Sequence, residues 1–587
     1  MKITLKNNKT KPYLEALPDI LRYQLFTKSF LALGLFLLGR LFRILLKSAG
    51  RVAVTSGDFL FLFRTWQGIL ILAVALTALF VYVALDLNAM IILSKNLLTG
   101  KKDSIWNVCL QAISSMNRFW NIRGIGIALY ILLIAPLIDI GFSITLSEGF
   151  YIPTFISSVI ADTPLYLILT YIVMAVFAVF GIANIFILHG ILIDDLSITD
   201  AGKQSKTIIR ENWKDYFKQN TVFILITMAI LALIGLAVLG LPLLLTAKLP
   251  LSATLRRGLT VFFLLQGATL FLIAGLIMTP FYMMKSIELY YTYKEGRPFT
   301  YTEREITRHP YGKIALILVI IAVILLTVSL NRNFDDVFPK NTDVKIIAHR
   351  GGGKEGAENT VAGLLKAWEK GAYGSEIDIQ RTKDGHYIIN HDGDFARVAG
   401  DDRSPEEMTL EEVRQLSVDG EQIPTLEEML DAGKGKLIVF VELKGATADR
   451  QMADDAVRII KEKHMEKQTV LISLQYGLID YIETKYPEME TGLLSFVSFG
   501  DTALLNCDYL ALEEESASSA LIDSIHDQGK KVLIWTVNEK GSQKHFLCSK
   551  TDALITDNVS QAMDMIEEIN NRSDLNRIID RIQELFS

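Results

Sequence analysis

The sequence predicts an α-helical transmembrane domain followed by an α/β domain, a (β/α)8 TIM barrel with a small insertion. Half of the 587 residues are hydrophobic, and the apolar excess lies almost entirely before residue 331. Such long runs of Leu, Ile, Val, Phe and Ala are typical of membrane-spanning helices. The residues after 342 have the mixed composition of a globular protein, and short apolar strands alternate there with helical patterns. That alternation, over a length that suits one barrel, predicts the second domain.

The membrane domain is predicted over residues 29–331, with about seven helices. Residues 1–28 are polar and contain no signal-peptide cleavage pattern, which predicts a cytoplasmic N-terminus. A weaker run at about 29–47 is interrupted by Arg40 and Arg43, and by hydropathy alone it could also be an interfacial helix. The six clear runs are about 66–93, 124–145, 164–192, 221–247, 260–284 and 313–330.

The distribution of basic residues predicts the orientation of these spans. If residues 29–47 cross the bilayer, Lys and Arg gather in the loops on one side, whereas the loop at 146–163 on the other side has none. Cytoplasmic loops carry the excess of basic residues, so we expect seven spans with the N-terminus inside. One predicted outside loop departs from this distribution, because it carries the basic residues Lys248, Arg256 and Arg257. The interpretation is a multi-pass cell-membrane protein with its C-terminal domain on the extracellular side.

Two ionisable residues, Asp86 and His189, lie within the apolar runs. Such residues often mark a polar site or pathway, but both lie toward the ends of their runs, where snorkelling to the interface also explains them. No internal repeat is visible, which weakens the case for a transporter built from duplicated halves. We therefore favour an anchor that can also collect a lipid-like substrate.

The barrel is predicted at residues 343–565, after a polar linker at 332–342 that contains Pro339 and before a helical tail at 566–587. A further run at 386–390 follows the turn TKDG too closely for a crossover helix, so it should pair antiparallel and stand outside the barrel. The stretch 392–424 is predicted to be an insertion, in which SPEEMTLEEVRQL forms one capped acidic surface helix. The eight expected strands are 344–348, 375–379, 437–442, 469–473, 491–494, 508–512, 531–536 and 552–555.

Polar residues gather at the expected C-terminal ends of these strands, where barrel enzymes keep their active sites. His349 follows the first strand, the second carries Glu376 and Asp378, and the third carries Glu442 with Lys444 two residues beyond. Separation by two places each pair on one face of its strand. Three carboxylates that face one cup would repel one another without a cation, and hard oxygen ligands suit Ca²⁺ or Mg²⁺ rather than zinc.

The hairpin after the second strand would bring His391 to the same cup. His386 has the opposite parity on that hairpin, so it should face away, and we assign it no role. A lone His-Arg-Gly or a strand of alternating acids can simply be a turn or a solvated sheet face. The ordered series HRG, ENT, E-I-D, H-D and E-L-K, each at an element boundary, favours a catalytic site.

The segments HRGGGKEGAENT, SEIDIQRTKDG, INHDGDF, VELK, IWTVN and ITDN resemble the signature of the glycerophosphodiester phosphodiesterase family, over residues 344–560. The upstream half resembles, more loosely, the multi-span domain that accompanies this enzyme in some bacterial proteins. Ala357 stands where the family usually has a proline, a change that affects the loop's rigidity but no ionisable group. Asn558 and Val559 replace a frequent aromatic and proline, so substrate contacts at that rim stay open.

The resemblance implies a role for each residue of the cluster. His349 and His391 would be the acid/base pair, and Glu376, Asp378 and Glu442 would hold one divalent cation, Ca²⁺ or Mg²⁺. Glu358 and Asn359 would shape the loop and cap a helix that begins near Thr360. The site would also include groups that bind the phosphate and the rest of the substrate. These groups are Arg350 and Lys444, which would neutralise the phosphodiester, and Trp535, which would either pack against the glycerol moiety or serve as a structural aromatic.

The leading hypothesis is a membrane-anchored phosphodiesterase that hydrolyses glycerophosphodiesters to glycerol 3-phosphate and an alcohol. Deacylated phospholipids, lysolipids and polyglycerophosphate wall polymers of the teichoic-acid type all fit this class. The alternative is a membrane transport or binding protein whose barrel recognises glycerophosphate groups without cleaving them. The net charge of -6 provides no basic field for nucleic acid. The partners are thus the phosphodiester substrate and the lipid bilayer, and homo-oligomerisation through the membrane domain stays open.

Overall fold

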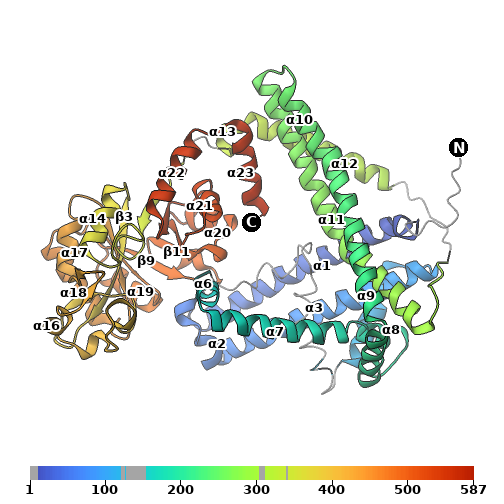
Figure 1. Ribbon diagram of the computed structural model, residues 1–587, viewed down its shortest axis with the longest axis horizontal. Helices are drawn as coiled ribbons and strands as arrows, with labels where there is room; N and C mark the ends of the chain where they lie inside the picture. The colour runs from blue at the N-terminus through green and yellow to red at the C-terminus, as the bar shows by residue number, and fades with distance from the viewer. Residues whose placement is uncertain are drawn as a thin grey trace. The chain divides into compact units, whose positions relative to one another are not determined.

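The computed structural model describes residues 11–119, 124, 126, 154–302, 311–338 and 342–586 (Figure 1). The chain forms two compact units. The first comprises Met1–Leu38, Leu72–Tyr151 and Ile160–Asn333, and the second comprises Gly39–Ile71, Ile152–Val159 and Phe334–Ser587. The expected span at 124–145, the first ten residues and the linker residue Pro339 lie wholly or largely outside the described residues.

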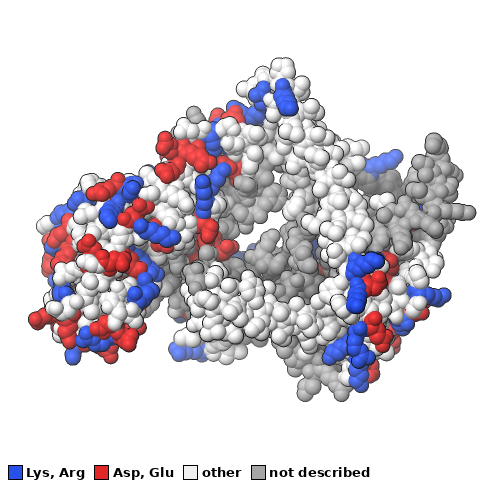
Figure 2. All heavy atoms as spheres, viewed as in Figure 1, with Lys and Arg blue, Asp and Glu red and all other residues white. Residues whose placement is uncertain are grey.

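The N-terminal half is helical, as predicted. Five helical segments among the described residues are long and apolar enough to cross a membrane: Lys11–Ser48, Trp66–Thr99, Pro164–Ile193, Ile198–Lys248 and Ala253–Glu295. The expected span at 29–47 lies within the first of them, α1. The expected last span lies within α12 (Tyr311–Arg332), whose apolar part is shorter. Long stretches of these helices are white in Figure 2, as membrane-spanning surfaces should be, whereas blue and red side chains gather near α8 (Ile187–Ile193) and the first half of α9 (Ile198–Gly235).

The elements within these segments begin and end at the following residues. The long helices are α1 (Lys11–Ser48), α3 (Trp66–Thr99), α7 (Pro164–Ala183), α9 (Ile198–Gly235) and α11 (Ala253–Glu295). A π-helical turn at Leu236–Gly240 joins α9 to α10 (Leu241–Lys248). The shorter helices are α2 (Phe61–Arg64), α4 (Ile105–Ser115), α6 (Thr154–Asp162) and α8 (Ile187–Ile193).

The two ionisable residues of the apolar runs have partners inside the helical unit. Asp86 accepts a hydrogen bond from the hydroxyl of Tyr23 at 2.8 Å. His189 is buried, and its Nε2 lies 3.1 Å from the hydroxyl of Ser286. The snorkelling explanation is therefore wrong for His189, because the side chain is buried in the helix packing, where its Nε2 contacts Ser286.

All eight predicted barrel strands are present and form one closed parallel ring. Their order is β2-β13-β12-β11-β9-β8-β7-β3, and pairing of β3 with β2 closes the ring. The strands are β2 (Lys345–Ala348), β3 (Gly374–Arg381), β7 (Ile438–Leu443), β8 (Thr469–Ser473), β9 (Glu490–Ser495), β11 (Tyr509–Glu513), β12 (Lys531–Trp535) and β13 (Ala553–Thr556). The surface of this domain carries interspersed acidic and basic side chains (Figure 2), typical of a solvated barrel.

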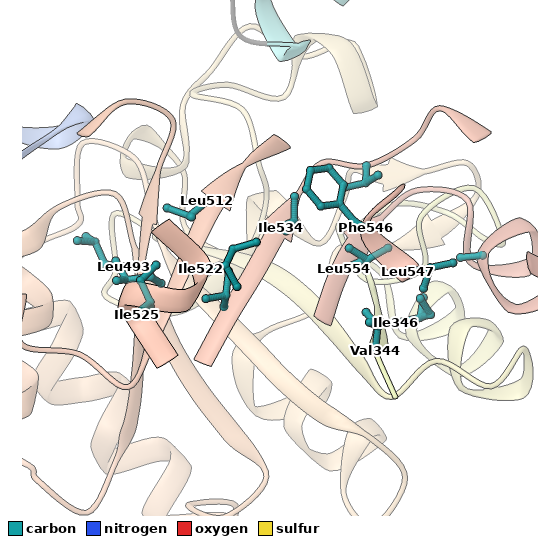
Figure 3. Packing of buried hydrophobic residues seen from close by; sticks show 14 of the residues in the cluster. Val344, Ile346, Leu493, Leu512, Ile522, Ile525, Ile534, Phe546, Leu547 and Leu554 are labelled. Atoms are coloured by element: carbon teal, nitrogen blue, oxygen red, sulfur yellow. The ribbon is translucent and has the colours of Figure 1, made fainter. Parts of the chain in front are cut away.

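Helices cover the outside of the ring. They are α14 (Val361–Glu369), α17 (Leu426–Gly433), α18 (Arg450–Glu462), α19 (Tyr476–Lys485), α20 (Ser519–His526), α21 (Lys540–Leu547) and α22 (Val559–Asn570). Outward-facing strand residues such as Ile346, Leu512 and Ile534 pack against Ile522 and other side chains of these helices (Figure 3). Residues of the opposite parity, among them Ile347 and Leu533, fill the lumen. This alternation is the period of two expected of a barrel strand.

The predicted hairpin is also present, since β4 (Tyr387–Ile389) pairs antiparallel with β3 and with no other barrel strand. The prediction of a single helix for SPEEMTLEEVRQL is wrong. The segment forms two separate turns, a 3₁₀ turn at Pro405–Glu407 and α16 (Leu410–Val413), with Met408 extended between them. Ser404 with Glu407, and Thr409 with Glu412, form two successive capping boxes, so a second helix start interrupts the first. The rest of the insertion holds α15 (Ala396–Ala399) and the short pair β5 (Ser417–Val418) and β6 (Glu421–Gln422).

Part of the predicted linker is helical. After α12, Phe334–Val337 forms α13, which packs with the C-terminal helix α23 (Asp574–Phe586). The guanidinium of Arg577 donates to the carbonyl of Phe338 and to Asp335, the latter at 2.6 Å. Because Arg577 is itself buried, these bonds fasten the entry of the barrel to its last helix.

One connection of the barrel lacks an α-helix. Between β9 and β11 the chain forms a short strand, β10 (Ser498–Gly500), and a 3₁₀ turn at Thr502–Leu504. Strand β10 pairs antiparallel with β1 (Ala53–Thr55), which lies between α1 and α3. A segment from the N-terminal half of the chain thus attaches to the barrel at this connection, in a two-stranded sheet outside the closed ring.

Candidate active site

Three buried carboxylates lie together at the C-terminal end of the barrel. Glu376 and Asp378 on β3 alternate with Ile377 and Ile379, which face the outer helices. The register pairs Asp378 directly with Glu442 on β7, so both carboxylates enter the lumen from adjacent strands. Each of the three offers one oxygen, and these oxygens lie within 4.8 Å of one another. Their exposures of 3%, 0% and 6% exclude the solvated sheet face that alternating acids could also indicate.

Lys444 balances part of this negative charge. Its Nζ lies 2.9 Å from Asp378 Oδ1 and 3.0 Å from Glu442 Oε2, so one ammonium bridges two carboxylates. Although burial would raise the pKa of Asp378, Lys444 and its other neighbours hold it below the ordinary value. Burial raises the pKa of Glu442 to about 7 despite Lys444. Burial and the two neighbouring carboxylates raise the pKa of Glu376 well above its ordinary value.

His349 follows β2 and is oriented by an aspartate from the adjacent strand end. Its Nδ1 lies 2.8 Å from Oδ1 of Asp557, directly after β13. Asn538 donates to the other oxygen of Asp557 at 2.7 Å. Burial raises the pKa of Asp557, but the bond from His349 outweighs it and keeps the carboxylate ionised. Since a carboxylate only accepts, Nδ1 carries a hydrogen and Nε2 is the nitrogen that remains for a substrate.

His391 is held in a comparable way after the hairpin. Its Nδ1 lies 2.7 Å from Oδ1 of Asp392, and its Nε2 lies 3.0 Å from a guanidinium nitrogen of Arg350. A guanidinium only donates, so Nε2 accepts and the ring is neutral in this arrangement. Burial is the main cause that lowers the pKa of His391 to about 4. The ring centroids of His349 and His391 are 6.5 Å apart, so the two imidazoles lie in one site.

The loop between β2 and α14 brings Arg350 into this cluster. Arg350 and Asn359 have positive φ angles of 49° and 54°, and the amide of Asn359 donates to the carbonyl of Arg350 at 2.7 Å. The amide of Arg350 donates to Glu376 at 2.8 Å, and Nδ2 of Asn359 donates to Asp378 at 2.9 Å. A side chain on Gly352 would meet the backbone of Gly363 at 2.6 Å, so the loop can approach the helix start only with glycine there. Helix α14 begins near the expected position, but its N-cap is Thr360, whose side chain accepts a hydrogen bond from the amide of Gly363, and not Glu358 or Asn359.

The structure therefore brings together seven of the eight residues that the sequence singled out as site residues. These seven are His349, Arg350, Glu376, Asp378, His391, Glu442 and Lys444. The eighth, Trp535, ends β12 on the same rim, where its indole nitrogen donates to the carbonyl of Ala511 at 2.8 Å. His386 is exposed on the hairpin, away from the cluster.

Sequence reasoning missed the carboxylates that orient the two histidines and gave Asn359 only a loop role. Asp392 directly follows His391, and Asp557 lies within the ITDN segment, so both belong to segments that the sequence had marked. The function of Asp557 was hidden because its contact with His349 spans 208 residues.

Comparison with known proteins covers both halves of the chain. The family described as glycerophosphoryl diester phosphodiesterase matches residues 349–561. The membrane domain of glycerophosphoryl diester phosphodiesterase matches residues 7–328, which is more than half of the chain. The chain belongs to the glycerophosphoryl diester phosphodiesterase family. It is an enzyme of the phosphoric diester hydrolase class with an N-terminal membrane domain.

Two relatives of this family are similar over the barrel. A glycerophosphodiester phosphodiesterase from Caldanaerobacter subterraneus subsp. tengcongensis is 28% identical over 242 residues, which are 38% of this chain and 98% of that protein. One from Bacillus altitudinis is 24% identical over 242 residues, 38% of this chain and 99% of the relative. Among solved structures, a phosphodiesterase from Oleispira antarctica in complex with the product sn-glycerol-3-phosphate is 23% identical. The two structures match over 38% of this chain and 96% of the Oleispira antarctica chain, with a TM-score of 0.36.

The pairing of His349 with Asp557 predicts a positioning effect. Exchange of Asp557 for asparagine (D557N) should lower kcat about 10²-fold with little change in KM, because an amide can hold the imidazole in the wrong tautomer. Steady-state kinetics of the full-length protein would measure this. The matched control is D552N at the opposite end of the same strand, where Asp552 pairs with His526 at 2.8 Å. Equal losses in both variants would show that Asp557 is merely structural.

Proposed function

We propose that the chain is a metal-dependent glycerophosphodiesterase whose reaction takes place in the cup formed by Glu376, Asp378 and Glu442. The observation that carries this proposal is the position of two carboxylate-oriented histidines beside three buried carboxylates at one end of a barrel. A binding protein that leaves its ligand intact would need no pair of proton-transferring groups. The products are glycerol 3-phosphate and an alcohol.

The proposed roles of the chain's own residues follow from their chemistry. The Nε2 atoms of His349 and His391 are the two proton-transfer positions, one for the attacking hydroxyl or water and the other for the leaving alcohol. Arg350 lies 3.0 Å from His391 and can turn to the phosphoryl oxygens with a planar fork of donors. Lys444 adds a positive charge beside the same oxygens. Trp535 offers an apolar face to the glycerol moiety at the rim.

The residues fit a divalent cation. Burial has raised the pKa values of Glu376 and Glu442. The cluster of three buried carboxylates is therefore stabilised when a hard cation replaces protons and Lys444 as its counter-charge. Thiols and imidazoles are absent from this set, which favours Ca²⁺ or Mg²⁺ over zinc. When bound, the cation supplies positive charge to the phosphoryl oxygens as negative charge builds up on them.

Cation affinity should increase with pH, because Glu442 must lose its proton before it can bind the cation. A carboxyl whose pKa is about 7 is protonated below that pH and must lose its proton before it can bind a cation. Between pH 6 and pH 8 the dissociation constant should therefore fall by at least about tenfold, with proton release on binding. Isothermal titration in buffers of different ionisation enthalpy measures both quantities. An E421Q control, at an exposed position of β6, should titrate as the native chain does. Equal affinity at the two pH values would contradict the assignment.

We also propose that the barrel lies on the extracellular side. The asymmetry of basic residues between the loops supports this orientation. A fusion of alkaline phosphatase after Arg332 should be active in a bacterial host. An inactive fusion, together with an active cytoplasmic reporter fused at the same residue, would reverse the orientation.

The function itself is tested by turnover. The purified full-length protein, supplied with Ca²⁺, Mg²⁺ or Mn²⁺, should release glycerol 3-phosphate from a deacylated phospholipid, and chelation should stop the reaction. Release of acylglycerol phosphate from a lysolipid, and of glycerol 3-phosphate from a polyglycerophosphate polymer, compares the three substrate classes. No turnover of any of them with any of the cations would refute the proposal.

A further inference from the structure

The segment between α1 and α3 is built into the barrel. Strand β1 pairs with β10 in the register Ala53 with Gly500, Val54 with Phe499, and Thr55 with Ser498. The amide of Phe496 donates to the hydroxyl of Ser56 at 3.3 Å. Residues 53–55 are buried, and Ala53 belongs to the same apolar core as strands β9 and β11. The segment is therefore part of the barrel's fold and not a loose connection.

This attachment lies at the end of the barrel that holds the site. Ser56 contacts the residue directly after β9, and a Cβ on Gly57 would meet the carbonyl of Leu474, directly after β8. Strand β8 is the neighbour of β7, which carries Glu442. The carboxyl ends of parallel strands share one end of a barrel, so the segment borders the catalytic cup.

The outer face of the same segment is apolar and exposed. Phe61 and Leu62 are buried, whereas Phe59, Leu60 and Phe63 are 40%, 57% and 59% exposed. Phe499 on the paired strand is 50% exposed. Three large exposed apolar side chains within five residues, beside a fourth on the partner strand, are costly in water.

The position of this apolar face in the chain points to the bilayer as the surface that covers it. Phe63 lies three residues before Trp66, where α3 begins, and α3 is one of the helices long and apolar enough to cross a membrane. Trp66 is itself exposed, as aromatic residues at the membrane interface are. A short segment so close to a span must lie at the interface, and its apolar face can enter the boundary between headgroups and acyl chains.

We infer that Phe59, Leu60 and Phe63 hold the rim of the catalytic cup in the bilayer surface, so that the site takes a glycerophosphodiester whose glycerol carries an acyl chain. This inference rests on the proposed function and narrows its substrate to a lysophospholipid. The phosphodiester enters the cup while the acyl chain stays among the lipids beside this apolar edge. A water oxygen bonds to phosphorus and gives up a proton. The bond from phosphorus to the oxygen of the headgroup alcohol breaks, and that oxygen takes up a proton in turn. The acylglycerol phosphate remains in the bilayer.

The test compares two substrates with one headgroup. The full-length protein is reconstituted in vesicles of phosphatidylethanolamine and phosphatidylglycerol and assayed with lysophosphatidylglycerol and with soluble glycerophosphoglycerol. The variant F59S/L60S/F63S should lose about tenfold in kcat/KM for the acylated substrate and stay within about twofold for the soluble one. The control W368S, an exposed aromatic on α14, should change neither. A native chain inactive on both substrates would refute the proposed function, whereas an active chain whose variant affects both substrates equally, or neither, refutes only the inference.

A second measurement does not depend on the triple variant's folding. Leu60 is exchanged for cysteine (L60C) in a C109S background and labelled with an environment-sensitive fluorophore. Cys109 is partly exposed and has to be removed, whereas Cys507 and Cys548 are buried. Lipids brominated along their acyl chains should quench this label, but not the same label at position 368. Absence of quenching at position 60 would overturn the placement of the segment in the bilayer.

Discussion

The variant H349A should lose about 10²- to 10⁴-fold in kcat, because it removes one of the two proton-transfer positions of the proposed reaction. The imidazole reaches the cup through its Nε2 while Asp557 holds its Nδ1 at 2.8 Å. Alanine leaves no group that can exchange a proton at that place, so water would have to take over the role. Steady-state turnover of a soluble glycerophosphodiester by the full-length protein, with saturating cation, measures the loss.

The matched control for this loss is H386A. His386 lies on the same hairpin as His391 but is exposed and away from the cup. Its variant should keep kcat within about twofold and unfold at nearly the native temperature, since surface substitutions are usually small in effect. If H349A kept full turnover, His349 would have no part in the chemistry.

The variant D378N should abolish cation-dependent turnover, with a loss of at least about 10²-fold. Asp378 is completely buried and receives hydrogen bonds from Asn359 at 2.9 Å and Lys444 at 2.9 Å. Asparagine has almost the same shape, but it brings no negative charge to the cation and only one oxygen to accept those two donors. The loss should appear in cation affinity as well as in kcat, and excess cation should restore little of it.

Thermal unfolding separates this effect from simple misfolding. Ca²⁺ or Mg²⁺ should raise the unfolding temperature of the native protein, and a chelator should remove that increase. The D378N protein should unfold near the temperature of the cation-free native protein and show no increase with either ion. E421Q, exposed on β6, should respond as the native chain does. A normal cation response in D378N would show that Asp378 is not a ligand.

Much of the site could be predicted because its residues follow local rules. Side chains of a strand alternate with a period of two, so the spacing of Glu376, Asp378, Glu442 and Lys444 already placed them on shared faces. The C-terminal position of these residues on their strands then assigned them to one end of the barrel. The hairpin that carries His391 followed from the turn between two closely spaced apolar runs. Each of these inferences needs only neighbouring residues.

The sequence was less informative where two local signals compete or where packing decides. Two capping boxes in succession divided the segment 404–413 into separate turns, although its composition suits one helix. In the membrane domain, His189 lies in a buried contact with Ser286, and hydropathy alone cannot distinguish such a contact from snorkelling.

The sequence by itself determined the two-domain plan, the eight strands and the faces that carry the carboxylates, because hydrophobic runs and period-two alternation are properties of short stretches of chain. Only the tertiary structure decided which groups orient the histidines and what borders the cup. Asp557 reaches His349 because closure of the ring pairs β13 with β2, and Ser56 reaches Phe496 across 440 residues. Such contacts depend on loop closure and packing of the whole domain, which no local pattern encodes.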